Sequence, residues 1–301
     1  MASTTAMPQS ITSTLRSYWE MTRPRVLLLV LVTGIPALFI GQNAQPNLSL
    51  AFWILLGTAL SGAACSILNA YLERDIDARM ARTQNRPLPT ASLAPNQALG
   101  MGIVLAVCST WMLFHFGGRV AAIIGAGSIL FYVFVYTLGL KRRTPQNIVI
   151  GGAAGATAPL IADAAVDGTL GPAGWIFFLI IFLWTPPHFW AIAIFRKEEY
   201  ANADLPMMPI VIGDQATRRL SLLYTLAMLP VTMAPLFLGH LGWVYGGTAI
   251  VGGTWFALWN IRALKAQKRE VDWMVFKASV IYLGLLFAAM LTDYALGTPG
   301  I

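Results

Sequence analysis

A cluster of carboxylates stands where the second apolar segment of the chain ends. The apolar run 48–68 is followed by Asn69, Glu73 and Asp77, which are spaced four residues apart. If the helix continues, this spacing puts the three side chains on one stripe and leaves Asp75 pointing away from it. Packing carboxylates at the edge of a membrane costs free energy, and a bound cation offsets that cost. Oxygen ligands suit a hard ion such as Mg²⁺, which typically takes one or two carboxylates together with substrate phosphates.

An ordinary charged helix end is the alternative interpretation of the same residues. Arg74 lies within the stretch and could neutralise its neighbours without any metal. The bases that follow, Arg79, Arg82 and Arg86, favour the metal interpretation, because proteins hold phosphates with metal ions and arginines. The stretch therefore indicates a site for a metal and a phosphorylated ligand.

A second basic stretch closes the fourth apolar segment with Lys141, Arg142 and Arg143. Membrane topology and the helix dipole alone would place three bases at a helix C-terminus. The alternative is that Lys141 or one of the arginines contacts an anionic group of a substrate.

The sixth apolar segment contains a proline pair beside a histidine. Pro186 and Pro187 predict a break in the helix, and such breaks are tolerated where the backbone lines a cavity. His188 is either a packed core histidine or a partner for the backbone groups that the prolines free. The surrounding Trp184 and Trp190 either pack or shelter a carbocation with their ring faces.

The composition requires a membrane. Hydrophobic residues make up 57% of the 301 residues and charged residues 11%, with a mean hydropathy of +0.65, whereas a soluble domain is roughly a quarter charged. A bilayer core about 30 Å thick takes roughly 20 apolar residues per helix. We predict nine such segments, and hence an all-α polytopic membrane protein: 26–42, 49–70, 98–116, 119–140, 147–166, 173–195, 218–239, 242–262 and 273–296.

The basic residues predict the orientation. If the N-terminus lies inside, nineteen of the 20 Lys and Arg fall on the inner side or its helix ends, and only Arg119 falls outside. The net charge of +7 therefore reports topology rather than nucleic-acid binding. The long inner loops 71–97 and 196–217 carry seven of the 13 acidic residues and six of the 20 basic ones, and such loops commonly form sites. We expect a cytoplasmic tail over 1–25.

Three separated motifs resemble those of the UbiA-type intramembrane prenyltransferases. Residues 69–77 look like their Asn/Asp-x-x-x-Asp-x-x-x-Asp motif, with Glu73 in place of the commoner Asp. The stretches similar to the heme farnesyltransferases of that superfamily are 74–83, 141–152 and 187–196. The superfamily's second Asp-x-x-x-Asp site is replaced here by His188, Arg196, Lys197, Glu198 and Glu199. The resemblance covers about residues 20–295.

The resemblance implies a fold and a set of site residues. The fold is nine transmembrane helices around a central cavity, capped by two long cytoplasmic loops, in one prenyltransferase domain over 26–296 with a short C-terminal tail at 297–301. The catalytic residues, which would bind Mg²⁺ or another divalent cation, are Asn69, Glu73 and Asp77. Those implied for diphosphate are Arg74, Arg82, Arg86, Lys141 and Arg142. Those implied for heme are His188 and Arg196. With a heme substrate, His188 would be an axial ligand of the iron, and the alternative is that it contacts the diphosphate.

The resemblance also implies a reaction and a location. The farnesyl group of farnesyl diphosphate would pass to a vinyl group of heme b with addition of water, giving heme O. The protein would be multi-pass in the lipid bilayer of a bacterial inner membrane, with heme A synthase or a terminal oxidase assembly as protein partner and no nucleic acid. A transporter of an anionic solute is the alternative class, although transporters usually place their site at the bilayer midplane.

Overall fold

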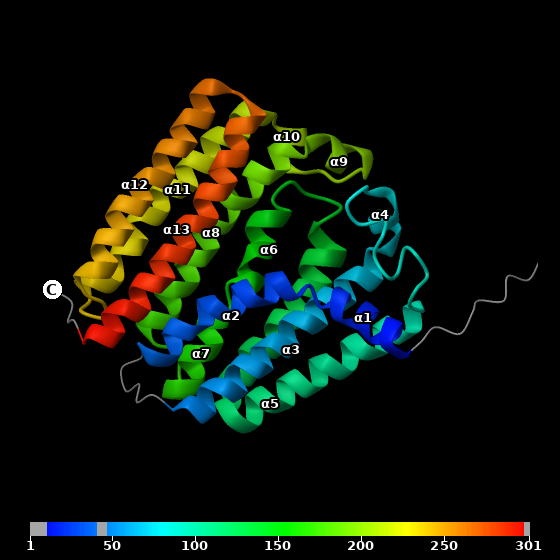
Figure 1. Ribbon diagram of the computed structural model, residues 1–301, viewed down its shortest axis with the longest axis horizontal. Coiled ribbons are helices and arrows are strands. Elements are labelled where there is room, and N and C mark those ends of the chain that lie inside the picture. Colours follow the sequence, from blue (N-terminus) through cyan, green and yellow to red (C-terminus); the bar gives the residue numbers. More distant parts are fainter. Residues whose placement is uncertain (1–10, 41–46, 298–301) are drawn as a thin grey trace, which may run out of the picture.

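The computed structural model describes residues 11–40 and 47–297, and the regular secondary structure within them is helical throughout (Figure 1). In chain order the elements are α1 (Ile11–Met21), α2 (Pro24–Phe39), α3 (Leu48–Leu72), α4 (Arg74–Arg79), α5 (Pro95–Leu130), the π-helix η1 (Phe131–Leu140), α6 (Asn147–Gly155), α7 (Ala158–Asp167), α8 (Pro172–Phe195), α9 (Lys197–Asn202), α10 (Met208–Val211), α11 (Asp214–Phe237), α12 (Trp243–Ala266) and α13 (Arg269–Leu296).

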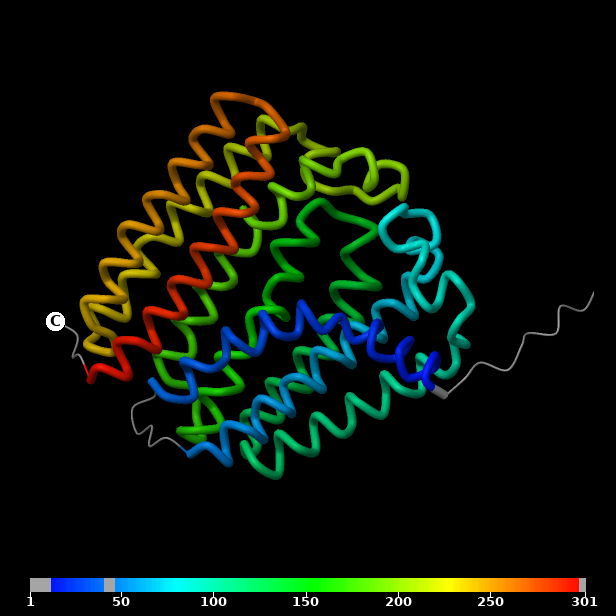
Figure 2. Tube along the Cα trace, in the orientation of Figure 1, coloured from blue at the N-terminus to red at the C-terminus, as the bar shows by residue number. Residues whose placement is uncertain are grey.

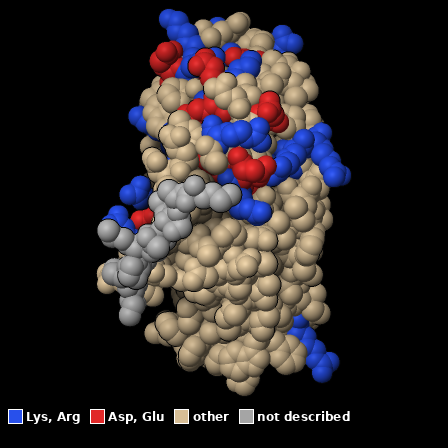
Figure 3. Space-filling model, turned by 90° about the vertical axis from the view of Figure 1, so that its right-hand side faces the viewer, with Lys and Arg blue, Asp and Glu red and all other residues tan. Residues whose placement is uncertain are grey.

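The long helices pack as two groups in one bundle (Figure 2). One group is α2, α3, α5 and α7, and the other is α8, α11, α12 and α13. The π-helix η1 and α6 pack against each other, and α6 also contacts α8. Lys, Arg, Asp and Glu side chains gather at one end of the face in Figure 3, and the rest of that face is almost free of them. The bundle therefore has one charged end and long apolar flanks.

Among the described residues, six helices are long and apolar enough to cross a membrane, or seven if α1 and α2, which meet at a 49° bend, form one span. The predicted count of nine is not reached by this measure. The stretch 95–140 counts once because helix continues through it, although it holds two predicted segments and kinks at Gly118. Gly118 has a φ of 80°, which glycine adopts without steric cost. The predicted segment 242–262 lies in α12, which is not among the six.

The helix break predicted at Pro186 and Pro187 is wrong. Both prolines are buried inside α8, which runs without interruption, because packing by neighbouring helices holds a transmembrane helix through such residues. The interruption falls instead at Ala156 and Thr157, between α6 and α7. Pro159 explains it, because proline has no N–H to donate to the carbonyl four residues earlier.

The π-helical geometry of η1 was not predicted. Its last turn is closed by the Lys141 N–H, which donates to the Tyr136 carbonyl at 2.9 Å. The Tyr136 ring lies directly against Gly151 of α6, where any Cβ would overlap it. Glycine at 151 thus lets η1 and α6 approach closely, and π-type turns often lie at functional sites.

Several predictions about the chain ends stay untested. The described part of the predicted tail 1–25 includes the helix α1, and residues 1–10 lie outside the described residues. The predicted C-terminal tail 297–301 lies outside them as well, apart from Gly297.

A buried ion pair joins α11 to α13. The Arg218 guanidinium donates to both carboxylate oxygens of Asp272, at 2.9 and 2.5 Å, and both side chains are almost fully buried. Two aligned hydrogen bonds satisfy charges that are otherwise costly in an apolar bundle.

Arg218→Met should destabilise the bundle by about 3–5 kcal/mol, because it leaves the Asp272 carboxylate buried without a partner. The double variant Arg218→Met/Asp272→Leu should recover most of that loss, since no unpaired charge remains. Thermal unfolding in detergent measures both. A double variant as unstable as the single one would contradict this account of the pair.

Candidate active site

The predicted stripe survives a break in the helix. α3 ends at Leu72 and α4 begins after Glu73, whose φ of −107° and ψ of 13° leave helical geometry. The Glu73 N–H still donates to the Asn69 carbonyl at 2.9 Å, and the Asp77 N–H to the Glu73 carbonyl at 2.8 Å. Asn69, Glu73 and Asp77 are therefore in register, with exposures of 1%, 2% and 5%. Asp75, off the stripe, is exposed as predicted.

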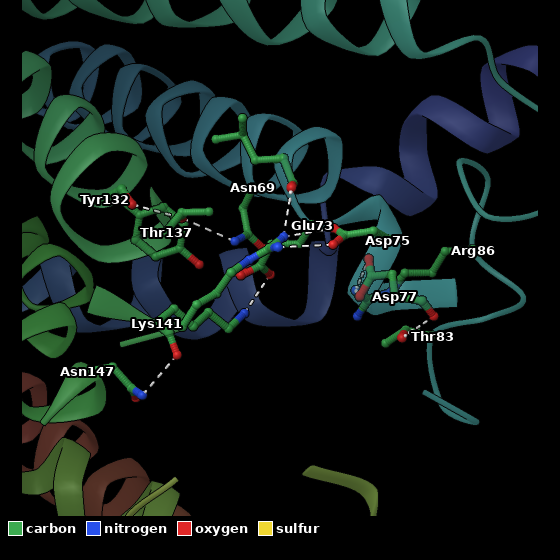
Figure 4. A network of polar contacts seen from close by, with 12 residues as sticks. Asn69, Glu73, Asp75, Asp77, Thr83, Arg86, Tyr132, Thr137, Lys141 and Asn147 are labelled. Carbon is green, nitrogen blue, oxygen red and sulfur yellow. Dashed lines mark hydrogen bonds and ion pairs between the residues drawn. The ribbon is translucent and has the colours of Figure 1, made fainter. Parts of the chain in front are cut away.

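Each buried carboxylate of the stripe is paired with a base (Figure 4). Glu73 Oε2 accepts from Lys141 Nζ at 2.5 Å, and both oxygens of Asp77 accept from Arg86 Nη1 at 2.9 Å. Lys141 comes from the end of η1, 68 positions along the chain from Glu73. The fold thus brings one base from far along the chain and one from the nearby loop to the stripe.

Arg23 is a site residue that the sequence reasoning missed. Its Nη2 donates to Asn69 Oδ1 at 3.1 Å, and the Asn69 amide donates to Thr137 Oγ1 at 3.2 Å. The Arg23 backbone is left-handed, with φ 54° and ψ 61°, which is uncommon for a residue other than glycine. The available signal in the sequence is a basic residue directly before Pro24, where α2 begins. The positive-inside rule accounts for that residue without any role in the site.

Three of these bases surround a small cavity. Arg23, Arg82 and Arg86 line a space of about 160 Å³ together with Asp77. Burial and the charge of Arg23 lower the pKa of Arg86, while the charge of Asp77 raises it and that of Arg82 lowers it further. The lining also includes Glu20, so three guanidinium groups face two carboxylates. The cavity keeps a net positive charge, which favours binding of an anionic ligand.

Two of the bases predicted for diphosphate lie elsewhere. Arg74 is exposed, and its guanidinium lies 4.9 Å from the centre of the Tyr71 ring and donates to the Tyr71 carbonyl. Arg142 is exposed and pairs with Asp75 at 2.8 Å. Burial raises the pKa of the Asp75 carboxyl, but the hydrogen bond and charge of Arg142 bring it below its ordinary value. For Arg74 and Arg142 the contact with diphosphate stays a prediction.

The stripe offers oxygen atoms that a hard cation could use. Glu73 Oε1 is buried and has no hydrogen-bond partner among the described residues. Among the residues that the structure describes, no group of three or more His, Cys, Asp and Glu side chains is placed to hold a metal ion. The donors of Asn69, Glu73 and Asp77 therefore fit Mg²⁺ only if a ligand completes the coordination, as phosphate oxygens typically do.

A second, larger cavity of about 290 Å³ has a mostly apolar lining. Its lining includes Tyr136, Gly151, Trp184, His188 and Leu283, contributed by four elements of the bundle. The Tyr136 ring connects this cavity to the stripe. The centre of the ring is 5.7 Å from Nζ of Lys141, which pairs with Glu73. Lys141, the partner of Glu73, thus lies beside the wall of the apolar cavity, and Asp77 lines the positive one.

His188 lies on the wall of this apolar cavity, as the sequence interpretation required. Its ring stacks on Trp184 at 4.1 Å between centres, and its Nδ1 lies 2.8 Å from Ser279 Oγ. No hydrogen bond reaches Nε2 from the described residues, so this nitrogen is the one available to a ligand.

Arg196, the other residue predicted for heme, does not line that cavity. It follows the end of α8 and pairs with Glu199 Oε1 at 3.4 Å. Its Nε is buried and has no partner among the described residues. Glu198 points away from this pair and binds Arg269 at 2.8 Å. The structure therefore separates the two predicted heme residues.

Several sequence relatives match almost the whole of this chain. The protoheme IX farnesyltransferase of Symbiobacterium thermophilum is 42% identical over 280 residues, which cover 92% of this chain and 94% of that one. That of Gloeobacter violaceus is 43% identical over 284 residues, 94% and 93% of the two chains. That of a Roseiflexus species is 43% identical over 93% of this chain, but the match covers 53% of the relative. The chain thus spans about half the length of the Roseiflexus protein.

Solved structures share the fold at lower identity. A structure described for digeranylgeranylglyceryl phosphate synthase superposes with a TM-score of 0.80 at 18% identity, over 93% of this chain and 98% of that one. A UbiA homolog from Archaeoglobus fulgidus bound to DMAPP and Mg²⁺ gives 0.69 at 17% identity, over 91% and 99%. Residues 30–290 match the UbiA prenyltransferase family. The chain belongs to the UbiA prenyltransferase family.

Proposed function

We propose that this protein transfers the farnesyl group of farnesyl diphosphate to a vinyl group of heme b, with addition of water, giving the hydroxyethylfarnesyl group of heme O. The observation that carries the proposal is the buried stripe Asn69, Glu73 and Asp77. Asp77 lines the positive cavity, and Lys141, the partner of Glu73, lies beside the Tyr136 ring on the wall of the apolar cavity. Relatives about 40% identical carry the name protoheme IX farnesyltransferase, which supports these two substrates over others.

The positive cavity is the proposed diphosphate end. Asn69, Glu73 and Asp77 would hold Mg²⁺ or another divalent cation, which when bound draws charge onto the departing diphosphate. The DMAPP and Mg²⁺ in the Archaeoglobus fulgidus homolog support a cation of this kind. Arg23, Arg82 and Arg86 would bind the phosphate oxygens with charge-assisted hydrogen bonds. Lys141, already next to Glu73, would stay close enough to neutralise the leaving group.

The apolar cavity is the proposed reaction chamber. Breaking the bond between the farnesyl carbon and oxygen leaves an electron pair on diphosphate and a positive charge on the allyl group. The ring faces of Tyr136 and Trp184 would stabilise that charge, and the apolar wall would exclude water until the new bond forms. The vinyl π electrons form the carbon–carbon bond. Water then adds to the cation beside the porphyrin and releases a proton.

His188 is the proposed axial ligand of the heme iron. Ser279 holds Nδ1, which fixes the ring and leaves Nε2 for the metal of the substrate. An axial bond would orient one vinyl group toward the farnesyl carbon, so position rather than a protein nucleophile would determine the product. Arg196, at the end of α8, would meet a propionate at the edge of the porphyrin.

We further propose nine membrane spans around the central cavity, with the N-terminus and the two long loops in the cytoplasm of a bacterial cell. This count takes 95–140 as two spans joined at Gly118 and adds α2 and α12 to the helices that pass the length and hydropathy test. The charged end in Figure 3 would then face the cytoplasm, in keeping with the positive-inside rule. Heme A synthase or a terminal oxidase assembly would receive the product.

Incubating the purified protein with heme b and farnesyl diphosphate should give a porphyrin heavier by one farnesyl group and one hydroxyl group, measured by mass spectrometry. Chelation of divalent cations should reduce formation of this product to the level seen without protein, and added Mg²⁺ should restore it. The reason is that the stripe needs a cation to hold the diphosphate. Unaltered heme in both conditions would contradict the proposal. Movement of farnesyl diphosphate across a vesicle without any product would favour a transporter instead.

Asp77→Asn should lower the turnover rate by a factor of several hundred, since losing one buried charge contact costs about 3–5 kcal/mol. Asp75→Asn is the matched control two residues away: its ion pair with Arg142 is exposed and worth at most about 1 kcal/mol, so the rate should fall no more than about fivefold. Product mass over time measures both. Equal losses would mean that the stripe is not the site.

Cysteines at Asn96 and Thr169 should be labelled from opposite sides of the membrane. Both positions are exposed, one in the first turn of the long helix α5 and the other in the connection between α7 and α8. In a background without Cys65 and Cys108, an impermeant thiol reagent should reach the cysteine at Asn96 only from the cytoplasm and that at Thr169 only from outside. Labelling of the first from outside would overturn the orientation.

A further inference from the structure

A continuous row of rings runs along the seam between α8 and α13. Successive ring centres in this row are 5.1, 4.9, 4.8 and 4.1 Å apart, in the order Phe195, Trp273, Phe276, His188 and Trp184. The row begins at Phe195, which is exposed, and ends at His188 and Trp184 on the wall of the apolar cavity. Aromatic side chains thus connect the outside of the bundle to the proposed reaction chamber.

The row is fixed at the cavity end only. Ser279 of α13 contacts His188 Nδ1 through its hydroxyl, and its carbonyl accepts from Trp184 Nε1 at 2.8 Å. The rings of Phe195 and Trp273, at the other end, come from different helices and meet by ring packing alone. A flat ligand could therefore displace side chains at the outer end without breaking a hydrogen bond between these rings.

Lys277 is the cation beside this row. It is exposed on α13 and lies eight residues beyond Arg269, which is about 12 Å along the helix axis. Its Nζ is 5.8 Å from the centre of the Trp273 ring, and within the described residues it makes no ion pair. A base this far into a membrane span is costly without a partner, and such residues commonly mark a ligand path.

These features select one class of ligand. A porphyrin has an extended flat π surface, which stacks on aromatic rings, and two carboxylates on one edge, which pair with a base. A phospholipid headgroup would supply the anion but has no flat surface for Trp273 and Phe276. The combination of a ring row and a single cation fits an anionic aromatic macrocycle.

We propose that the seam between α8 and α13 is where the porphyrin substrate is bound on its way to the reaction chamber, with Lys277 pairing a propionate and Trp273 stacking on the macrocycle. The inference rests on the proposed function, because it is heme b that this site would take. It assigns the direction of approach: the propionate edge stays at Lys277 while the opposite edge of the ring enters toward His188.

The test is heme affinity rather than turnover. Ferric heme b and its dimethyl ester, in which both propionates are capped, are titrated into the protein in nanodiscs of uncharged lipid, and binding is measured from the absorption of the heme. Lys277→Ala should weaken binding of heme b about tenfold and leave binding of the ester unchanged. Lys277→Arg should keep most of the affinity for heme b. Lys265→Ala, an exposed lysine on α12, is the matched control and should change neither.

Trp273→Leu provides a second measurement. It should weaken binding of heme b and of the ester alike, because stacking does not depend on the propionates. If Lys277→Ala leaves the affinity for heme b unchanged, or weakens both ligands equally, the proposed pairing with a propionate is overturned. Wild type that binds neither porphyrin would overturn it as well.

Product mass separates this inference from the proposed function. If the wild type converts heme b and the Lys277→Ala variant binds heme b normally, the proposed porphyrin site between α8 and α13 is wrong and the farnesyl transfer stands. If the wild type binds heme b with the expected dependence on Lys277 but forms no farnesylated product, the binding site stands and the transfer is wrong.

Discussion

Burial of two carboxylates at the edge of an apolar bundle is the constraint on which the rest of the site depends. Glu73 and Asp77 are nearly inaccessible to solvent, so each needs a base within hydrogen-bond distance. Lys141 from η1 and Arg86 from the loop after α4 satisfy this need. The pairing fixes where η1 ends and how the loop folds back. The loop lines the positive cavity, and η1 lines the apolar one.

The close approach of η1 and α6 sets the boundary between the two chemical environments. Tyr136 packs against Gly151 and presents its ring both to the apolar cavity and to Lys141. A charged group and a hydrophobic chamber thus share one side chain as their common wall. This arrangement suits a substrate with an anionic head and a hydrocarbon tail, because each half meets a surface of matching polarity.

The sequence predicted the local features of the site well. A spacing of four identified Asn69, Glu73 and Asp77 as one buried stripe, and even a helix break at Glu73 did not disturb it, because two hydrogen bonds keep the register. The positions of Arg23, Arg74 and Arg142 could not be predicted in this way. Whether a base points into a cavity or toward solvent depends on contacts with residues far away in the chain, which periodicity does not encode. The prediction from Pro186 and Pro187 failed for a related reason. Helix propensity predicted a break in α8, but packing against neighbouring helices preserved the helix.

Synthesis of the chain delivers Glu73 to the membrane before its base. Lys141 follows 68 residues later, after α5 and η1 have been made. Chains are built from the N-terminus at a finite rate, so there is an interval in which the carboxylate has no partner. If Glu73 entered the apolar phase during that interval, its carboxylate would be buried without a partner, which costs free energy. The stripe therefore has to remain at the water-facing end of α3 until η1 is inserted, which makes biogenesis of this site a late and coupled event.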